Sequence, residues 1–362
     1  MFKKFKYIDW FLYISVFLIL SLSVVTIYSI TYSQADKHLL YNQILFAITG
    51  IIIAIAIQVL DYRALKSYAL IIYVIGILSL ILVLFFHSDA TGTTRWFDIG
   101  FFRLQPSEIF KIVLIITLPA FLSEKDNIDL KTLLYSLGII ALPVFLVIMQ
   151  PDMGTAIILS IIGLTILIAA GMSKKLIIYL LLLIGSLAPL FWFLVLKPYQ
   201  KLRIISFLNP QSDPFGSGYH VLQSIIAIGS GMILGRGLGK GFQSQLKFLP
   251  APHTDFIFAV LAEGLGIIGV IVLLILFLIV ILRLIQALNI VSDKFAYLII
   301  SGIITFFLLH IFINIGMNIG IAPVTGVPLP FMSYGGSHVL TGMILIGIVQ
   351  SIYTRRKKIG II

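Results

Sequence analysis

The sequence has no cysteine, which excludes disulfide bonds, catalysis by a thiolate and metal sites built from cysteine. It is also poor in charge, because only 11% of its residues are Asp, Glu, Lys or Arg, whereas a typical soluble domain has roughly 25%. Hydrophobic residues, by contrast, make up 60% of the chain. This composition excludes an ordinary soluble protein and predicts a polytopic membrane protein.

Signals for nucleic acid, a bound nucleotide or a metal cluster are also missing. The formal net charge is +11, but the basic residues are scattered and the aromatic residues lie inside apolar runs, unlike a nucleic-acid-binding surface. The glycines between residues 229 and 241 follow no predicted strand, so they form neither a Rossmann nor a P-loop motif. Their amides could still contact phosphate, although a flexible turn is the stronger interpretation. The histidines at 38, 87, 220 and 338 have no metal-ligand spacing.

Long apolar runs recur along the whole chain, and each is long enough to cross ~30 Å of hydrocarbon. The first run follows three N-terminal lysines like a signal peptide, but it is long and lacks a small-residue cleavage site, so we expect it to remain as a span. We therefore predict an all-α membrane protein, one domain over residues 1–362 with about ten spans. The runs lie near 10–30, 43–60, 67–86, 105–123, 132–149, 153–171, 176–196, 256–282, 295–318 and 337–353.

The distribution of lysine and arginine predicts the orientation of these spans. Basic residues favour every second connection, counted from the N-terminus, which places both termini in the cytoplasm. The main exception is the loop 197–254, which we expect on the outer face and which is long enough to escape the rule. Within it, residues 219–234 carry an apolar stripe at helical spacing, which predicts an interfacial helix.

The long loop 197–254 is basic, with six lysines and arginines against Asp213 alone. Such a surface at the outer face suits an anionic ligand such as a lipid phosphate or pyrophosphate. General attraction to anionic lipid headgroups explains it equally well. The basic residues are Lys197, Lys201, Arg203, Arg236, Lys240 and Lys247.

Asp255 lies where this loop becomes the eighth span, close to water and partly walled by hydrocarbon. A helix cap formed with Thr254 is the stronger interpretation from spacing alone. A catalytic base is the alternative. Glu263 follows eight residues later, ~12 Å deeper at ~1.5 Å per residue, and an acid at that depth needs a partner, for which Lys111 is one candidate.

Other polar residues interrupt the apolar runs on the outer side. Glu108 and Lys111 lie three residues apart on one helix face, so they should pair or line a hydrated cavity. Gln150 and Asp152 separate two spans, and Asp152 is expected to cap the sixth. A stripe of His310, Asn314 and Asn318 favours interhelical packing. The segment 319–336, rich in proline and glycine, should wall a site near Asp255, since irregular backbone at membrane depth needs such a setting.

Four segments together resemble one family, the SEDS glycosyltransferases RodA and FtsW. The segments are LPAPHTDFIFAVLAEGLG, RLQPSEIFKI, QPDMGTAIIL and PVTGVPLPFMSYGGS, and the resemblance extends over nearly the whole chain in the expected order. The start KYIDWFLY and the sequence GVPLPF favour the RodA branch, which serves cell elongation, over the FtsW branch, which serves division.

The resemblance implies polymerisation of lipid II into peptidoglycan glycan strands at the outer face of the bacterial cytoplasmic membrane, with release of undecaprenyl pyrophosphate. It also implies as partners a class B penicillin-binding protein, which crosslinks the strands, and other proteins of the elongation complex. A lipid II flippase and a non-catalytic scaffold for the transpeptidase are the alternatives. Polar residues crowd the outer side and few ions lie at mid-membrane, which favours surface chemistry over transport.

By the same resemblance, the essential acid of the family falls on Asp255. Glycan growth requires a base to take the proton of an attacking sugar hydroxyl, a role worth ~10²–10⁴-fold in rate. An apolar wall should raise the pKa of Asp255 and suit it to this role. The expected substrate-binding residues, from the resemblance and from the polar positions described above, are Glu108, Lys111, Gln150, Asp152, Arg203, Lys240, His253, Thr254, Glu263, Ser333, Tyr334 and Gly335.

The leaving pyrophosphate needs positive charge as the reaction proceeds. Basic side chains or a divalent cation, Mg²⁺ or Mn²⁺, can supply it, and Arg203, Lys240 and Lys111 are the candidate side chains. The chain departs from the family at Ala251 and Gly264, where an acid is common. Neither departure changes Asp255, but both weaken the case for a cation.

Overall fold

The computed structural model describes residues 8–32, 37–85, 95–98, 103–209, 216–246 and 248–355. Its helices and strands are α1 (Trp10–Thr31), α2 (His38–Val59), α3 (Tyr62–Ser67), α4 (Ala69–Phe85), β1 (Phe97–Asp98), β2 (Arg103–Leu104), α5 (Pro106–Leu122), α6 (Leu130–Met149), α7 (Met153–Ala169), α8 (Lys174–Leu190), the π-helix η2 (Phe191–Val195), α9 (Pro198–Leu208), α10 (Ser217–Ser230), α11 (Phe242–Gln245), α12 (Ile257–Ile290), α13 (Lys294–Asn318) and α14 (Gly336–Arg355).

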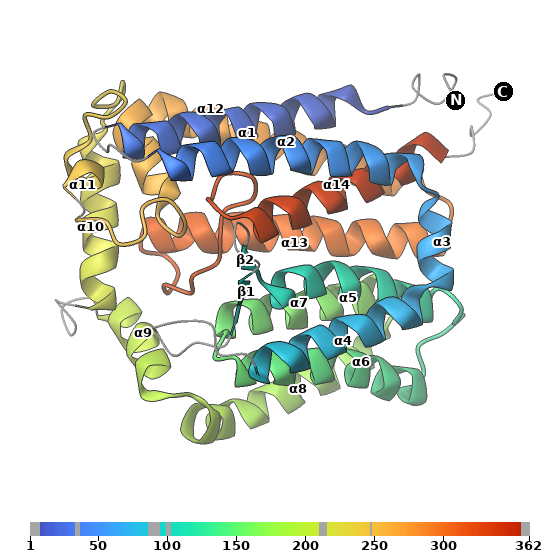
Figure 1. Ribbon diagram of the computed structural model, residues 1–362. Helices are drawn as coiled ribbons and strands as arrows, with labels where there is room; N and C mark the ends of the chain where they lie inside the picture. Colours follow the sequence, from blue (N-terminus) through green and yellow to red (C-terminus); the bar gives the residue numbers. More distant parts are fainter. Residues whose placement is uncertain are drawn as a thin grey trace.

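The long helices lie side by side along the horizontal direction of Figure 1 and form one bundle. Each predicted span corresponds to a helix, and the third, predicted near 67–86, corresponds to α4. Among the described residues, α1, α2, α6, α12, α13 and α14 are each long and apolar enough to cross a membrane, and α4 and α7 are shorter apolar helices. The expected all-α polytopic membrane fold is confirmed.

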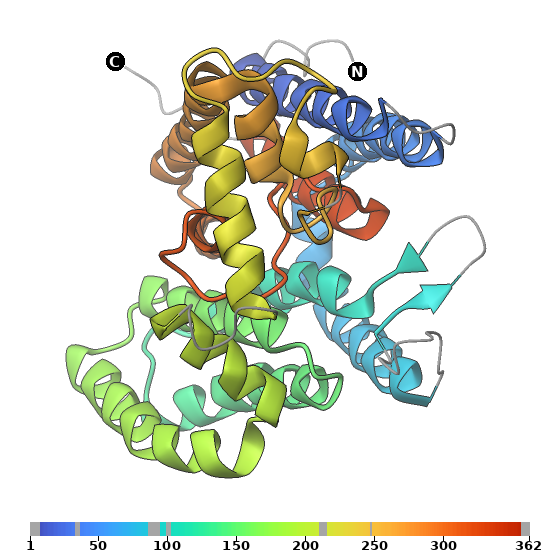
Figure 2. The same ribbon diagram turned by 90° about the vertical axis from the view of Figure 1, so that its left-hand side faces the viewer.

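The two ends of the bundle differ. At one end, here named the terminal end (right in Figure 1), α1 begins and α14 ends. At the other, the loop end, α10 runs across the ends of the long helices, as Figures 1 and 2 show from two directions. This confirms the helix predicted within 219–234. Before α5, the two short strands β1 and β2 pair antiparallel, and residues 91–94 and 99–102 around them lie outside the described residues.

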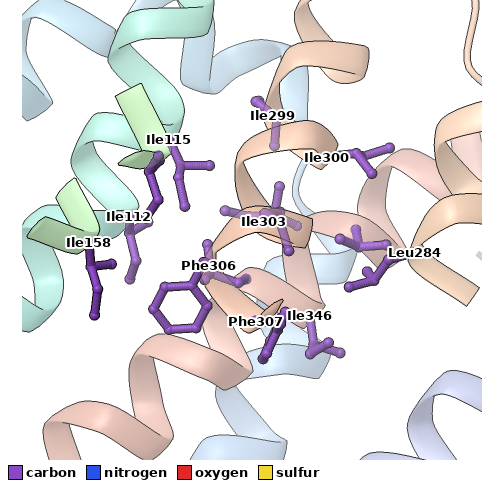
Figure 3. Packing of buried hydrophobic residues seen from close by; sticks show 14 of the residues in the cluster. Ile112, Ile115, Ile158, Leu284, Ile299, Ile300, Ile303, Phe306, Phe307 and Ile346 are labelled. Atoms are coloured by element: carbon purple, nitrogen blue, oxygen red, sulfur yellow. The ribbon is translucent and has the colours of Figure 1, made fainter. Parts of the chain in front are cut away.

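The core lies between α5, α7, α13 and α14, and Figure 3 shows part of it. Phe306 and Phe307 of α13 are fully buried there, with ring centroids 5.1 Å apart and nearly perpendicular planes. Glycines allow neighbouring helices to approach closely. A Cβ on Gly347 of α14 would lie only 2.8 Å from the carbonyl oxygen of Ala54 in α2, as expected for small residues at a helix interface within a membrane.

At the terminal end, polar groups from distant parts of the chain satisfy one another. The carboxylate of Asp9 accepts a hydrogen bond from the Leu12 amide at 3.1 Å, which caps α1. Its second oxygen lies 2.7 Å from Nε of Arg283 in α12. The backbone N–H and C=O of Asp9 bond to the side chain of Gln350 in α14 at 3.1 and 2.8 Å. These bonds join three helices.

The glycine-rich loop 231–241 packs tightly against a break in α12. At Gly266 the backbone is left-handed, with φ 67°. The freed groups of α12 pair with the loop, since the Arg236 amide donates to Glu263 O at 2.9 Å and the Ile267 amide donates to Met232 O at 2.9 Å. A Cβ on Gly235 would lie 2.2 Å from Gly264 O. The glycines therefore serve close backbone approach within a turn, as the assigned turns at 231–234 and 238–239 show.

Candidate active site

A cavity of about 180 Å³ lies at the loop end, where α5, α14 and the irregular segments before α12 and α14 meet. It brings together side chains that lie far apart in the sequence. Asp255 and Glu108 both line it, so two carboxyl groups share one small space. The lining residues are Trp96, Gln105, Glu108, Thr254, Asp255, Gly326, Pro328, Tyr334, Gly335, Ser337 and His338.

Asp255 does not cap a helix. Helix α12 begins at Ile257 after Phe256, and no side chain caps it. The helix-cap interpretation is therefore wrong. The residue is instead held through its backbone, because Asn314 and Asn318 of α13 both donate their side-chain amides to Asp255 O, at 3.1 and 3.0 Å. The polar stripe of α13 thus positions the candidate base.

The surroundings of Asp255 favour its protonated form. The carboxyl group is partly buried, and burial raises its pKa above the ordinary value. The positive charge of Arg203 opposes this shift, and the negative charge of Asp152 adds to it. The pKa shift expected from an apolar wall is thus present. Close by, burial lowers the pKa of His253, so its imidazole is neutral at neutral pH.

The segment 319–335 covers the cavity, as expected from its composition. Ser333 donates its hydroxyl to Thr254 O at 2.7 Å, and the Tyr334 amide donates to His253 O at 2.8 Å. Gly326 approaches the base directly, since a Cβ there would lie 3.5 Å from Oδ2 of Asp255. Its φ of +74° also suits glycine alone. The prediction that this segment walls a site near Asp255 is confirmed.

Behind one wall lies a buried polar cluster, made by Glu108, Lys111, His310 and His338. Lys111 is fully buried, and its Nζ lies 2.5 Å from Oε1 of Glu108 and 3.1 Å from Nε2 of His310. The second carboxylate oxygen of Glu108 lies 3.0 Å from Nδ1 of His338. The predicted Glu108–Lys111 pair is confirmed, and the suggested pairing of Lys111 with Glu263 is wrong.

Asp152 lies beside the cavity. Its Oδ1 accepts from the Thr155 amide at 3.2 Å, which confirms the predicted cap of α7. Its Oδ2 accepts from Nε2 of Gln105, a lining residue, at 3.1 Å. Asp152 therefore orients a wall of the cavity.

Several expected substrate-binding residues lie outside the cavity lining. Glu263 accepts hydrogen bonds from the amides of Gln243 and Ser244, at 2.7 and 3.0 Å, and so fixes the start of α11. Gln150 is buried, and its Nε2 donates to Leu80 O at 3.1 Å. Lys240 is exposed on the loop-end surface.

Two more of these residues contact the lining without belonging to it. The ring of His253 meets the ring of Tyr334 edge-on at 5.6 Å. Ser333 is fully buried, and its bond to Thr254 O makes it a support of the wall. Substrate contact by the residues outside the lining stays a prediction.

Part of the lining, most notably His338 and Ser337, does not follow from the sequence patterns. His338 has no metal-ligand spacing, so spacing gives no signal for it. A stronger signal was its depth, since it lies near the start of the tenth span at the end of the bundle that also holds Glu108. The neighbouring His310 does more than pack between helices, because its Nε2 lies 3.1 Å from Nζ of Lys111 and its Nδ1 lies 3.0 Å from Pro328 O.

Comparison with known protein families identifies the family to which the chain belongs. The model of the FtsW/RodA/SpoVE family, described as cell cycle proteins, matches residues 4–358. The chain belongs to this family. Among curated relatives, it is 41% identical over 312 residues to the peptidoglycan glycosyltransferase MrdB of Escherichia coli (strain K12), covering 86% of this chain and 84% of that protein. It is 31% identical to the peptidoglycan glycosyltransferase RodA of Treponema pallidum (strain Nichols), covering 96% and 98%.

Solved structures agree with this assignment. A chain from a peptidoglycan synthase complex, described as coordinating polymerization and crosslinking, superposes with a TM-score of 0.84 at 30% identity, covering 97% of this chain and 99% of that chain. The crystal structure of the rod shape determining protein RodA of Thermus thermophilus superposes with a TM-score of 0.73 at 25% identity, covering 97% and 98%.

Proposed function

We propose that the chain is a peptidoglycan glycosyltransferase, which polymerises lipid II into glycan strands for cell elongation. The observation that carries the proposal is the cavity at the loop end, where the partly buried carboxyl group of Asp255 shares a small space with Glu108. Relatives named peptidoglycan glycosyltransferase, at up to 41% identity over most of the chain, support it.

In this reaction, the hydroxyl oxygen of one saccharide attacks the anomeric carbon of another. A new C–O bond forms as the bond from that carbon to the pyrophosphate oxygen breaks, and undecaprenyl pyrophosphate leaves. Asp255 takes the hydroxyl proton as general base. Its raised pKa makes it a better proton acceptor than an ordinary aspartate.

The leaving pyrophosphate needs a cation, and Arg203 suits this task best. Its charge acts on Asp255, so it lies near the reaction centre, and it is exposed on α9. Lys111 is fully buried and already binds Glu108 and His310. We therefore assign it to fixing Glu108 and keep the exposed Lys240 as a second candidate for the phosphate.

A divalent cation remains a separate prediction. The described residues contain no cluster of three or more His, Asp or Glu that could hold a metal ion by themselves. Mg²⁺ often binds through one or two carboxylates together with substrate phosphates, so the substrate would have to complete such a site. No step above depends on it, and polymerisation with and without a chelator tests it.

The proposed orientation in the membrane follows from the difference between the two ends of the bundle. The loop end, with the cavity, faces outward, and the terminal end, where α1 begins and α14 ends, faces the cytoplasm, in agreement with the basic residues near both termini. The proposed membrane is the bacterial cytoplasmic membrane. The proposed partners are a class B penicillin-binding protein and other proteins of the elongation complex, because a similar chain belongs to a synthase complex that coordinates polymerization and crosslinking.

The test is glycan polymerisation by purified protein supplied with lipid II, with and without the class B partner. Asp255→Asn keeps the size of the side chain but removes the base, so the rate should fall by ~10²–10⁴-fold. The matched control is Asp129→Asn, the same change at the exposed cap of α6. Asn is also a good cap, so the control should polymerise like the wild type.

Either of two results would contradict the proposal. Equal polymer from Asp255→Asn and wild type would remove Asp255 from the chemistry and direct attention to Glu108 and Asp152. No polymer from the wild type, even with the partner and divalent cations, would favour a flippase or a scaffold.

A further inference from the structure

We propose that Gln105 is a further substrate-binding residue, whose side-chain oxygen Oε1 accepts a hydrogen bond from a hydroxyl or N–H group of the substrate. Asp152 is the positioning residue that turns this oxygen toward the cavity. The proposal rests on the proposed function, because the substrate that it concerns is lipid II. The reaction scheme above uses neither residue.

The backbone of Gln105 is fixed beside the cavity. Gln105 immediately precedes α5, where its amide donates to the Ser337 hydroxyl at 3.0 Å and its carbonyl accepts from the Glu108 amide at 3.1 Å. Its side chain does not cap α5. Instead, its Nε2 donates to Oδ2 of Asp152 at 3.1 Å. Gln105 is therefore held through both its backbone and its side chain, and it lines the cavity together with Asp255.

Asp152 decides which way the side-chain amide of Gln105 points. The partners of its carboxylate among the described residues are all donors, since Oδ1 accepts from the Thr155 amide at 3.2 Å and Oδ2 accepts from the Ser107 hydroxyl at 3.5 Å as well as from Gln105. An ionised carboxylate can only accept. A turn of the amide by half a revolution would bring Oε1 against a carboxylate oxygen and lose the bond. The Nε2 atom therefore faces Asp152, and Oε1 faces away from it.

The Oε1 atom of Gln105 is open to a ligand. It forms no hydrogen bond with any residue that the structure describes, and it is not among the unpartnered side-chain atoms that are fully enclosed. Gln105 as a whole is 9% exposed, so the small part that stays accessible includes this atom. Because Gln105 lines the cavity, its Oε1 presents an acceptor there in a fixed orientation.

An amide oxygen selects the group that meets it. A hydroxyl or an amide N–H can donate to Oε1 of Gln105, whereas the oxygen of an ionised phosphate can only accept. Other groups of the lining, such as the Trp96 indole and the Thr254 hydroxyl, can donate, so the cavity as a whole does not select one class of ligand. The selection holds at one position. There, the group of the substrate beside Gln105 is a donor, such as a sugar hydroxyl or an acetamido N–H.

One substitution reverses the amide of Gln105 without changing the size of its partner. Asp152→Asn keeps an oxygen for the Thr155 amide, since Asn is as good a helix cap as Asp, and it places an NH2 group opposite Gln105. The amide of Gln105 must then turn, so that its oxygen accepts from the introduced asparagine and its nitrogen faces the cavity.

A second substitution restores the original arrangement. When Gln105→Glu is added to Asp152→Asn, the introduced glutamate accepts from the introduced asparagine with one oxygen and presents the other oxygen to the cavity. The double variant also has the same net charge as its parent. A purely structural role of Asp152 would not predict this rescue.

The variants are made in the Asp255→Asn background, in which turnover is slow, and lipid II binding is measured by titration. The loss of one hydrogen bond should weaken binding by Asp152→Asn ~3–10-fold, and binding by the double variant should return nearly to that of the parent. Charge alone predicts the opposite, because removal of a negative charge favours a ligand that carries pyrophosphate. Undecaprenyl pyrophosphate, which lacks the saccharide, should therefore bind Asp152→Asn no more weakly than the parent.

Thermal unfolding reports the fold of each chain. Lipid II binding by Asp152→Asn as tight as by its parent would overturn the proposal. So would an equal loss of undecaprenyl pyrophosphate binding, or a double variant that melts like the parent and binds lipid II no better than Asp152→Asn.

Gln105→Met removes the acceptor and leaves the cap of α7 in place, so it should show the same ~3–10-fold loss of lipid II binding. Unchanged binding by this variant would also overturn the proposal. Polymerisation by the wild type is measured in parallel. Its absence would contradict the proposed function, whereas the binding series still decides the role of Gln105.

Discussion

The two ends of the bundle use buried charge in different ways. At the terminal end, both the side chain and the backbone of Asp9 have hydrogen-bond partners. Its carboxylate accepts from Leu12 and Arg283, and its backbone bonds to the side chain of Gln350. At the loop end, Asp255 caps no helix, and the buried Nε2 of His338 bonds to none of the residues that the structure describes. The polar groups at the terminal end hold helices together, whereas at the loop end we propose that the carboxyl group of Asp255 acts on a ligand.

The contrast also holds between two aspartates that each precede a helix. Asp129 caps α6 by accepting from the Thr132 amide at 2.8 Å, and hydrogen bonds to Thr132 lower its pKa. Asp255 caps nothing, and burial raises its pKa. The ionised carboxylate of Asp129 therefore stabilises the fold, whereas that of Asp255 destabilises it. Such a loss of stability is expected at a functional site.

The largest expected effect comes from breaking one buried ion pair at each end. Lys111→Met leaves Glu108 charged and buried, and Arg283→Met does the same to Asp9, so each should cost ~3–5 kcal/mol of unfolding free energy. Their activities should differ. Lys111→Met should lose most polymerisation per folded molecule, because Glu108 lines the cavity, whereas Arg283→Met should retain it. Thermal unfolding and lipid II turnover are measured on the same samples.

An equal loss of activity per folded molecule in Arg283→Met would remove the distinction between the two ends. A double variant, Glu108→Gln with Lys111→Met, sharpens the comparison. It should recover part of the stability, because no buried charge is left unpaired, without recovering activity.

A smaller effect is expected from adding one methyl group at each end. Gly326 and Gly171 both have positive φ, so alanine strains the backbone similarly at the two positions. A Cβ at Gly326 would contact Oδ2 of Asp255 at 3.5 Å, whereas one at Gly171 meets nothing within 4 Å. The methyl group would occupy space beside the carboxyl group, so Gly326→Ala should lower kcat/KM about tenfold by misplacing the substrate. If Gly171→Ala lowered it equally, strain alone would be the cause.

The smallest effect concerns stability against pH. Because the folded-state pKa of Asp255 is raised, its contribution to stability falls as pH rises above the ordinary value of 3.8. Asp255→Asn should therefore melt at the same or a higher temperature than the wild type at neutral pH. Asp129 has a lowered pKa, so its contribution is present above 3.8 and is lost at lower pH. Asp129→Ala should melt slightly lower at neutral pH, with the difference shrinking in acid. Melting temperatures at several pH values check both, and a clearly lower one for Asp255→Asn would contradict the account.

Much of this architecture could be predicted from sequence, because a membrane span is a property of one continuous segment. The apolar runs predict the long helices of the described residues, and the apolar stripe within 219–234 predicts α10. Asp152 and the pair of Glu108 and Lys111 were also predicted, since caps and pairs three residues apart depend on local spacing.

The rest depends on contacts between distant segments. The place of His338 in the buried polar cluster follows from its contact with Glu108, 230 positions away. The break in α12 at Gly266 is satisfied only by backbone pairing with the loop at Met232. Glu263 was expected to find a charged partner, but it binds the amides of Gln243 and Ser244 in a loop that no local pattern places beside it.

The most direct test of the central claim is the pH dependence of kcat/KM for lipid II polymerisation by the wild type. If Asp255 is the base, the rate should fall as pH falls through a single ionisation above the ordinary value of 3.8. The residual activity of Asp255→Asn should lack that ionisation. A profile that keeps the same inflection in Asp255→Asn, or a wild-type rate that does not change across the acid range, would contradict the account.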